Sequence, residues 1–192
     1  MTTEEIRQEK KRIRRQVFEK EKELTALYKE NADKEIRRRI LEMPQYRDAE
    51  TVFCFVSMKN EIQTRPLLEK VLADGKKLAV PLCVEKGIMQ ARQISSLSEL
   101  EEGFYGILEP GKDTPLVPPE SIDFAVVPCV SCTREGVRLG HGGGYYDRYF
   151  ASLSNVFSVL VCRDALIQKE IPCEHFDVRF PVVVSEEFIG EK

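Results

Sequence analysis

The stretch GVRLGHGGGYYDRYF, residues 136–150, gathers the residue types of this sequence that could bind an anion. Glycines at positions 140, 142, 143 and 144 allow positive φ angles and leave backbone N–H groups accessible to a ligand. An apolar run precedes the stretch and helical spacing follows it, an order that places those N–H groups in front of a phosphate. The alternative is an ordinary turn, because glycine runs are common in turns. The spacing matches neither a Walker A loop nor the dinucleotide-binding GxGxxG motif.

The polar and aromatic residues around these glycines add further possibilities. Asp147, in the first turn of the expected helix, could complement the helix dipole or bind Mg²⁺ beside phosphate oxygens. Arg138 and Arg148 could each grip a phosphate with paired hydrogen bonds, or form surface ion pairs. Tyr145 and Tyr146 point in different directions on a helix, so we expect one to face a ligand and the other to pack in the core.

Two helices are predicted at the start of the chain. Apolar residues at helical spacing predict a long amphipathic helix over residues 3–30, whose other face is charged. A second helix is predicted from about Asp33, as the N-cap, to Pro44, which ends it. Lys10 and Arg14 lie one turn apart on the same face of the first helix, where the simplest interpretation is a pair of solvated charges.

The middle of the chain changes to strand periodicity. The runs TVFCFV (51–56) and KLAVPL (77–82) flank a helical segment at 64–74. The two runs and this helix together form a strand–helix–strand unit. Strands that are apolar on both faces are typical of parallel sheets covered by helices. We therefore expect a single α/β domain over residues 1–192, with three layers (α/β/α), a central, mostly parallel, mixed sheet and a long N-terminal helix. Further strands are predicted at residues 88–93, 122–128, 156–161 and 182–184.

The composition limits the class of protein. A hydrophobic fraction of 42% and a charged fraction of 32% are those of a globular chain, and a net charge of −3 argues against a nucleic-acid partner. The longest apolar run, residues 52–56, is too short to cross a bilayer, so we expect no membrane partner. The charged first 15 residues do not resemble a signal peptide. We expect a monomeric, cytoplasmic protein.

The six cysteines do not follow the spacing of a small disulfide-rich domain. Cys129 and Cys132 form a CxxC pair, with His141 nine residues further on and with Cys173 and His175 near the C-terminus. Such a set could bind zinc, although a single CxxC pair is weak evidence for a metal site. The favoured interpretation is two reduced thiols packed beside the glycine loop.

The glycine stretch resembles a known family signature. RLGHGGGYYDRYF is similar to the RLGxGxGYYDRxL signature of the 5-formyltetrahydrofolate cyclo-ligase family. Other segments resemble that family in the same order along the chain, so that the resemblance spans almost all of it. These segments are KKRIR (10–14), SMKNEIQT (57–64), GKKLAVP (75–81) and YGILEP (105–110).

The resemblance implies an activity. Enzymes of this family convert 5-formyltetrahydrofolate and ATP to 5,10-methenyltetrahydrofolate, ADP and phosphate, with Mg²⁺, on an α/β fold. Phosphorylation of the formyl oxygen makes it a leaving group, so that the neighbouring pterin-side amine can close the ring and expel phosphate. Catalysis of this kind is mainly positioning and charge neutralisation. The implied partner is a small folate, with ATP and Mg²⁺ as cofactors.

The resemblance also implies site residues, each at a position that matches a family motif. Asp147 is the expected Mg²⁺ ligand, and Arg148 and Tyr145 are the expected catalytic residues. Glu61 would accept hydrogen bonds from pterin N–H groups. The residues expected to bind the folate are Val56, Glu61, His141, Gly142, Gly143, Gly144 and Tyr145. Those expected to bind ATP are Lys10, Arg14, Arg138, Leu139, Gly140, His141, Gly142, Gly143, Gly144, Tyr145 and Tyr146.

Several positions depart from the family pattern. Cys129, Cys132 and Thr133 stand where the family usually has glycine, phenylalanine and aspartate, and Pro181 stands where it has a second metal-side aspartate. A lost carboxylate weakens Mg²⁺ binding without abolishing it, because ATP supplies oxygens of its own. The departures leave two other hypotheses open: a paralogue that binds nucleotide or folate without turnover, and a ligase or kinase for another small molecule.

Overall fold

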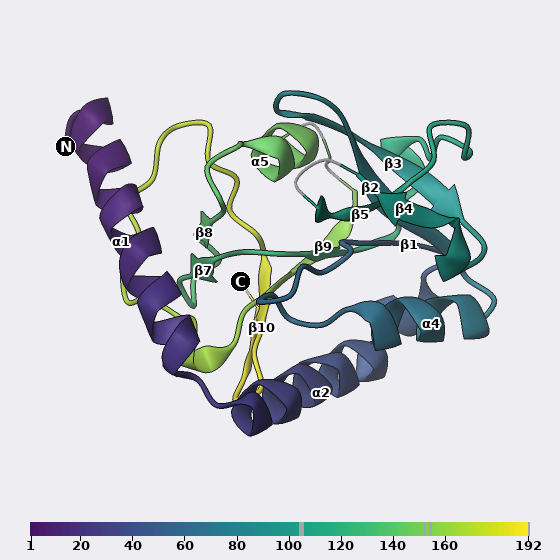
Figure 1. Ribbon diagram of the computed structural model, residues 1–192, viewed down its shortest axis with the longest axis horizontal. Helices are drawn as coiled ribbons and strands as arrows, with labels where there is room; N and C mark the ends of the chain where they lie inside the picture. Colours follow the sequence, from purple (N-terminus) through teal and green to yellow (C-terminus); the bar gives the residue numbers. More distant parts are fainter. Residues whose placement is uncertain (104–105, 152, 154, 192) are drawn as a thin grey trace.

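The computed structural model describes residues 1–103, 106–151, 153 and 155–191. Helices come first, and strands then alternate with shorter helices and loops (Figure 1). The helices are α1 (Thr3–Glu23), α2 (Ala26–Glu42), α3 (Pro44–Asp48), α4 (Arg65–Ala73) and α5 (Tyr145–Phe150). The strands are β1 (Thr51–Cys54), β2 (Lys77–Glu85), β3 (Ile88–Ile94), β4 (Leu100–Glu102), β5 (Leu108–Pro110), β6 (Phe124–Val127), β7 (Ser131–Cys132), β8 (Arg138–Leu139), β9 (Phe157–Val161), β10 (Val182–Val184) and β11 (Ile189–Glu191).

A seven-stranded sheet forms the centre of the structure, in the order β11-β10-β9-β6-β1-β2-β3. The pairings from β10 across to β2 are parallel, and the edge strands β11 and β3 run antiparallel to their neighbours. From β1 the chain builds β2 and β3 on one side, and later β6, β9 and β10 on the other, so the strand order reverses between β1 and β6. Ligands of open α/β sheets bind at the carboxyl ends of the strands at such a point.

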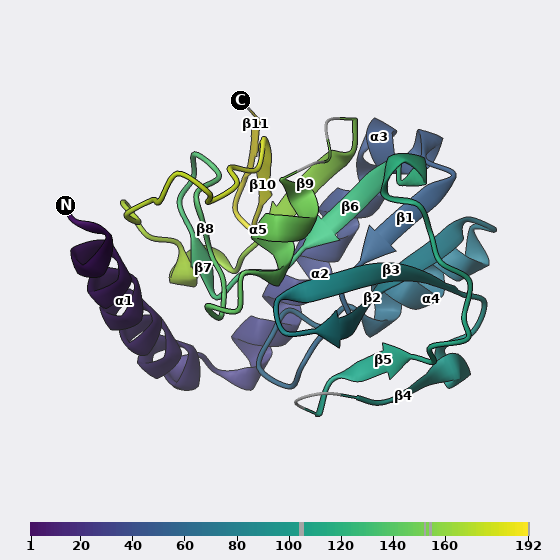
Figure 2. The ribbon, with the colours of Figure 1, turned by 90° about the horizontal axis from the view of Figure 1, so that it is seen from above.

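Alternate residues of each central strand pack against different helices. Phe53 and Leu160 lie in a core with Ile13 of α1 and the apolar face of α5. Their chain neighbours Val52 and Val159 lie in the opposite core, with α2, α3 and α4. Figures 1 and 2 show α2 and α4 together on one face of the sheet and α5 on the other. The expected three-layer α/β/α arrangement with a mixed, mostly parallel sheet is confirmed.

The boundary between the first two helices differs from the prediction. The single helix predicted over residues 3–30 is two helices, α1 and α2, which meet at Leu24 and Thr25. Both of these residues have extended backbone, and the Thr25 side chain accepts a hydrogen bond from the N–H of Tyr28, as an N-cap does. Asp33 is not an N-cap but lies in the middle of α2, where it is buried. The prediction was wrong because the apolar spacing continues across the break.

The buried Asp33 forms an ion pair with Arg163, which follows β9. Hydrogen bonds of 2.8 and 3.0 Å join the guanidinium to the carboxylate, and the two side chains are only 3% and 8% exposed. Arg163 also donates to the backbone carbonyls of Asn60 and Glu61, at 3.2 and 2.9 Å. The pair therefore joins α2 and the end of β9 to the loop that follows β1.

The predicted strands at 51–56, 77–82, 88–93, 122–128, 156–161 and 182–184 are confirmed as β1, β2, β3, β6, β9 and β10. The sequence does not predict β4, β5, β7, β8 and β11, because two or three residues are too few to show a periodic pattern. Tyr105 of the YGILEP segment lies outside the described residues, and the end of that segment forms β5. None of the helices described is both long and apolar enough to span a membrane.

The Asp33–Arg163 pair makes a prediction about stability. Asp33→Ala removes the hydrogen-bonded carboxylate of the buried Arg163 guanidinium and leaves it only the more distant carboxylate of Glu21, at 3.7 Å, so the free energy of unfolding should fall by up to about 3–5 kcal/mol. Glu35→Ala on the same helix is the control, because Glu35 pairs with the largely exposed Arg38, and such pairs contribute about 0.2–1 kcal/mol. Urea unfolding of both variants measures the two costs. Equal costs would show that the buried pair is not an anchor of the fold.

Candidate functional site

The glycine loop, residues 140–144, lies over the carboxyl ends of β1 and β6. Arg138, just before the loop, donates from Nε to the carbonyl of Pro128, directly after β6, at 2.7 Å. His141 in the loop lies 3.4 Å from Glu61, which belongs to the segment after β1. Gly144 caps α5 with a φ of 68°, a left-handed conformation that favours glycine. The loop thus occupies the point where the strand order reverses.

Two arginine side chains occupy the space in which other residue types would place a Cβ. A Cβ on Gly140 would lie 2.6 Å from the guanidinium of Arg138, closer than non-bonded atoms approach. A Cβ on Gly144 would lie 2.8 Å from the guanidinium of Arg148. Arg148 also donates a hydrogen bond to the carbonyl of Gly143. The glycines therefore allow two positive charges to approach the backbone of the loop.

Arg14 brings a third positive charge to the loop, from α1. Its Nε donates to the carbonyl of Gly140 at 2.7 Å, and its guanidinium lies 3.6 Å from the place of a Cβ on Gly142. Burial first, and then the neighbouring charge of Arg138, lower the pKa of Arg14. Like charges held close together in a partly buried site favour a bound anion. A phosphate suits this set, because guanidinium groups bind its oxygens with paired hydrogen bonds.

Lys10, one turn before Arg14, is buried and already paired with carboxylates. Its ammonium lies 3.4 Å from a carboxylate oxygen of Glu174 and forms a shorter ion pair with Asp177. Asp177 also accepts the backbone N–H of Glu174, at 2.6 Å. Lys10 thus lies one turn from Arg14 and holds the segment 174–177 against α1, so the interpretation of Lys10 as a solvated charge is wrong.

Asp147 of α5 lies beside the arginines and could hold a cation. Its Oδ2 accepts a hydrogen bond from Arg138 at 3.2 Å, and its Oδ1 accepts the N–H of Val178 at 3.4 Å. The side chain is 17% exposed, so a ligand can reach the carboxylate. One carboxylate next to phosphate oxygens is a donor set that suits Mg²⁺, which keeps several waters. Pro181, at the position of the family's second aspartate, offers no side-chain oxygen.

A cavity of about 350 Å³ adjoins the loop at α5. Tyr145, Arg148 and Tyr149 of α5 form one wall. Arg148 donates from Nε to the carbonyl of Gly87 at 2.7 Å, and because it also binds the glycine loop it separates the cavity from the loop. The volume is within the range of small-molecule sites. Apolar side chains supply much of the remaining lining, from Ile88, Met89, Leu116 and Val117.

The residues expected to bind the folate lie on two sides of the loop. Glu61 contacts His141, whose ring stacks on Phe18 of α1 with 6.0 Å between ring centroids. Val56 is buried, and neither Val56 nor Glu61 is among the described residues that line the cavity. Tyr145 is the member of the expected folate set that reaches the cavity.

The two tyrosines of α5 differ in surroundings, as their positions on a helix predict. Tyr145 lines the cavity, whereas the ring of Tyr146 packs against Phe150 with 6.4 Å between centroids. The guanidinium of Arg138 lies 4.9 Å from the centroid of the Tyr146 ring, and burial raises the pKa of Tyr146. Leu139 is buried in the core, so only its backbone can meet a ligand. Tyr146 therefore supports Arg138 from the core side, and Leu139, the next residue in the chain, anchors Arg138 to the core.

Comparison with known proteins shows the family of the chain. The 5-formyltetrahydrofolate cyclo-ligase family matches residues 6–186. The chain belongs to this family. A curated relative is the 5-formyltetrahydrofolate cyclo-ligase of Escherichia coli (strain K12), which is 27% identical over 180 residues, 91% of this chain and 99% of the relative. The cyclo-ligase of Mycolicibacterium smegmatis is 31% identical over 145 residues, 70% of this chain and 73% of the relative.

Solved structures of this family have the same fold. The NMR structure of Aquifex aeolicus 5,10-methenyltetrahydrofolate synthetase matches with a TM-score of 0.83 and 28% identity, covering 95% of this chain and 92% of the other. The synthetase of Mycoplasma pneumoniae matches with a TM-score of 0.75 over 92% of this chain and 98% of the other, and at 18% identity this likeness shows the fold alone. Membership of the cyclo-ligase family makes the chain a ligase.

Three further residues that no cyclo-ligase motif quoted above contains also shape the site. Arg163 holds the segment with Glu61, Phe18 supports His141, and Gly87 accepts a hydrogen bond from Arg148. Arg163 could have been found from the sequence, because a charged residue directly after a buried parallel strand lies at the ligand-binding edge. Nothing in the sequence around Phe18 and Gly87 indicates that these two residues belong to the site.

Because Arg148 lies close to Gly144, a methyl group added at residue 144 should disturb the position of the guanidinium. Gly144→Ala should displace the Arg148 guanidinium and lower kcat/KM for the reaction proposed below by about ten- to a hundredfold, because a hydrogen bond to a charged group contributes about 1.5–3 kcal/mol. Gly75→Ala is the control, since Gly75 has a similar φ of 73° but open space around its Cβ position. Steady-state kinetics compare the two variants. Equal loss in both would attribute the effect to backbone strain alone.

Proposed function

We propose that this protein converts 5-formyltetrahydrofolate and ATP to 5,10-methenyltetrahydrofolate, ADP and phosphate, with Mg²⁺. The observation that carries the proposal is the approach of three guanidinium groups, from Arg14, Arg138 and Arg148, to one glycine loop. A cavity of small-molecule size adjoins the same loop. An anion site next to an apolar cavity suits a reaction between a nucleoside triphosphate and a substrate that carries aromatic rings.

The phosphates of ATP are bound by the loop and its arginines in this proposal. Backbone N–H groups of residues 140–144 donate to phosphate oxygens, and Arg14 and Arg138 neutralise their charge. Lys10 adds a further positive charge and holds Asp177 beside Arg14. Bound phosphate relieves the repulsion between Arg14 and Arg138, which, after burial, is the second cause that lowers the pKa of Arg14. Tyr146 and Leu139 keep the loop and Arg138 in position.

Asp147 would hold Mg²⁺ beside these phosphates, and the ion would supply neutralisation of phosphate charge. Arg138 bonds to Asp147 at 3.2 Å and so fixes the orientation of the carboxylate. The loss of a second carboxylate at Pro181 leaves more of the coordination to water and phosphate.

The folate is placed on both sides of Arg148 and Tyr145 in this proposal. The cavity takes an aromatic part of the folate, and Glu61 accepts hydrogen bonds from pterin N–H groups next to His141. Tyr145 and Arg148, between the cavity and the loop, touch the reacting groups. Arg148 stabilises the charge that develops as the formyl oxygen takes up the phosphoryl group, and Tyr145 holds the substrate in line for ring closure.

We also propose that the protein works as a monomeric, single-domain enzyme over residues 1–192 in the cytoplasm. All six cysteines are free thiols, which suits a reducing compartment.

The reaction gives the test of this proposal. Methenyl-folate absorbance should rise when the protein is mixed with ATP, Mg²⁺ and 5-formyltetrahydrofolate. Arg14→Ala and Asp147→Asn should each lower kcat/KM by about 10²–10³, the size of losing one preorganised electrostatic contact. Arg12→Ala and Asp113→Asn are matched controls, because Arg12 is an exposed residue of the same helix and Asp113 an exposed loop carboxylate.

Two outcomes would contradict the proposal in different ways. Full turnover in Arg14→Ala and Asp147→Asn would show that the site is elsewhere. Tight binding of ATP or folate without turnover in the unaltered protein would make it a binding paralogue instead of an enzyme.

A further inference from the structure

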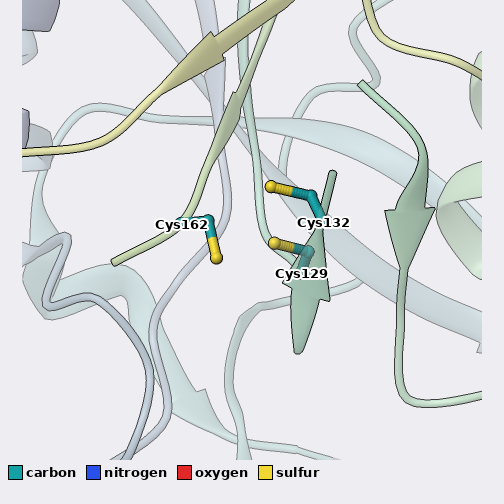
Figure 3. Close-up of side chains that lie close together, drawn as sticks. All are labelled: Cys129, Cys132 and Cys162. Atoms are coloured by element: carbon teal, nitrogen blue, oxygen red, sulfur yellow. The ribbon is translucent and has the colours of Figure 1, made fainter. Parts of the chain in front are cut away.

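Three cysteine side chains meet beside the glycine loop, and the proposed reaction uses none of them. The sulfur atoms of Cys129, Cys132 and Cys162, here named the thiol cluster, all lie within 4.8 Å of one another. Cys129 follows β6, Cys132 ends β7, and Cys162 follows β9. Figure 3 shows the sulfur atoms of Cys129 and Cys132 projecting toward the side on which Cys162 lies. The parallel pairing of β6 with β9 brings these segments together.

The spacing of the sulfur atoms suits a metal ion. Zinc binds thiolates at about 2.3 Å, and a tetrahedral arrangement then places the sulfur atoms roughly 3.8 Å apart. Sulfur atoms that all lie within 4.8 Å of one another reach that arrangement with small side-chain rotations. Thiolates are soft ligands, and three of them together select zinc over magnesium or calcium.

Neither simple packing nor a disulfide accounts for the three thiols together. Thiols behave as small hydrophobic groups with weak donors, so core packing does not require their sulfur atoms to converge. A disulfide would use two of the sulfur atoms and leave the third without a partner. None of the six cysteines of the chain is in a disulfide. Cys132 and Cys162 are buried, and the half-buried Cys129 leaves a path by which an ion could enter.

The surroundings of the cluster favour ionisation of one thiol, that of Cys129, whereas hydrogen bonding to Cys129 raises the pKa values of the Cys132 and Cys162 thiols, which a metal ion would have to deprotonate. Burial raises the pKa of the Cys129 thiol, but hydrogen bonds from the other two thiols and the charge of Arg138 outweigh this effect and leave the pKa well below its ordinary value. Glu61 and Asp164 are the acidic groups that face the cluster. In its neutral form the Cys129 thiol can donate to the carbonyl of Val161, which lies 3.3 Å from the sulfur. Arg138 would balance the excess negative charge of three thiolates around one divalent ion.

We propose that the thiol cluster binds one Zn²⁺ ion through Cys129, Cys132 and Cys162, with water or a small ligand at the fourth position. This ligand set differs from the one that the sequence suggested, because His141 contacts Glu61 and Phe18 and is not part of the cluster among the described residues. The ion links the segments after β6 and β9. One of its ligands, Cys129, is the residue after Pro128, whose carbonyl accepts a hydrogen bond from Arg138. The ion therefore stiffens the segment that supports Arg138 beside the glycine loop.

Competition between the reduced, metal-free full chain and a chromophoric zinc chelator tests the site. We expect one Zn²⁺ per chain. Cys129→Ser and Cys162→Ser should each weaken zinc binding by more than a hundredfold, since even the loss of an outer-shell partner costs about 10–100-fold. Cys83→Ser and Cys173→Ser are the controls, because these thiols lie outside the cluster. Less than stoichiometric zinc, or equal loss in the control variants, would overturn the proposal.

A second measurement does not depend on the variants' folding. Co²⁺ added to the unaltered chain should give intense sulfur-to-cobalt charge-transfer absorption and the visible bands of a tetrahedral ion, and Zn²⁺ should displace both. Circular dichroism of each serine variant shows whether it is folded. A cobalt spectrum without thiolate charge transfer would contradict a thiolate site, whatever the variants do.

Discussion

The contact between Arg14 and the glycine loop is the interaction on which the rest of the site depends. It joins α1 to the sheet edge, and it holds two like charges, Arg14 and Arg138, against a backbone that has no side chains in their way. Burial of Ile13 and Val17 of α1 contributes about 1.5–3 kcal/mol per side chain, which offsets this repulsion. Asp147 pairs with Arg138 and Asp177 lies near Arg14, so carboxylates balance part of this charge, and in our proposal a bound phosphate balances the rest.

A second group of buried charges fixes the segment that faces His141 of the glycine loop. Arg163 pairs with Asp33 of α2 and donates to the backbone of Glu61, so one side chain sets the position of the segment that faces His141. Cys162, the residue before Arg163, belongs to the thiol cluster. The segment after β9 thus contacts the backbone of Glu61, the helix layer and the thiol cluster at once, whereas the segment after β8 is the glycine loop, which we propose binds the phosphates.

The apolar segments of the sequence predict most of the fold, because helical spacing marks the amphipathic helices and continuous apolar runs mark strands that are buried on both faces of the sheet. The helix break at Thr25 could not be predicted, since the cap that makes it is local while the apolar spacing runs on. Arg14, Arg138 and Asp147 follow from family motifs. Contacts between distant segments, such as Phe18 with His141 or Cys162 with the CxxC pair, depend on strand order, and no local pattern encodes it.

Binding of phosphate by the arginines of the loop is tested most directly by calorimetric titration of the unaltered protein and of Arg14→Ala with Mg-ATP and with adenosine. Adenosine shares the base and ribose of ATP but has no phosphate for the loop to bind. We predict that Arg14→Ala weakens the affinity for Mg-ATP by about tenfold or more and leaves the affinity for adenosine unchanged, because a charge-assisted hydrogen bond contributes about 1.5–3 kcal/mol. An unchanged affinity for Mg-ATP, or an equal loss for both ligands, would contradict this account.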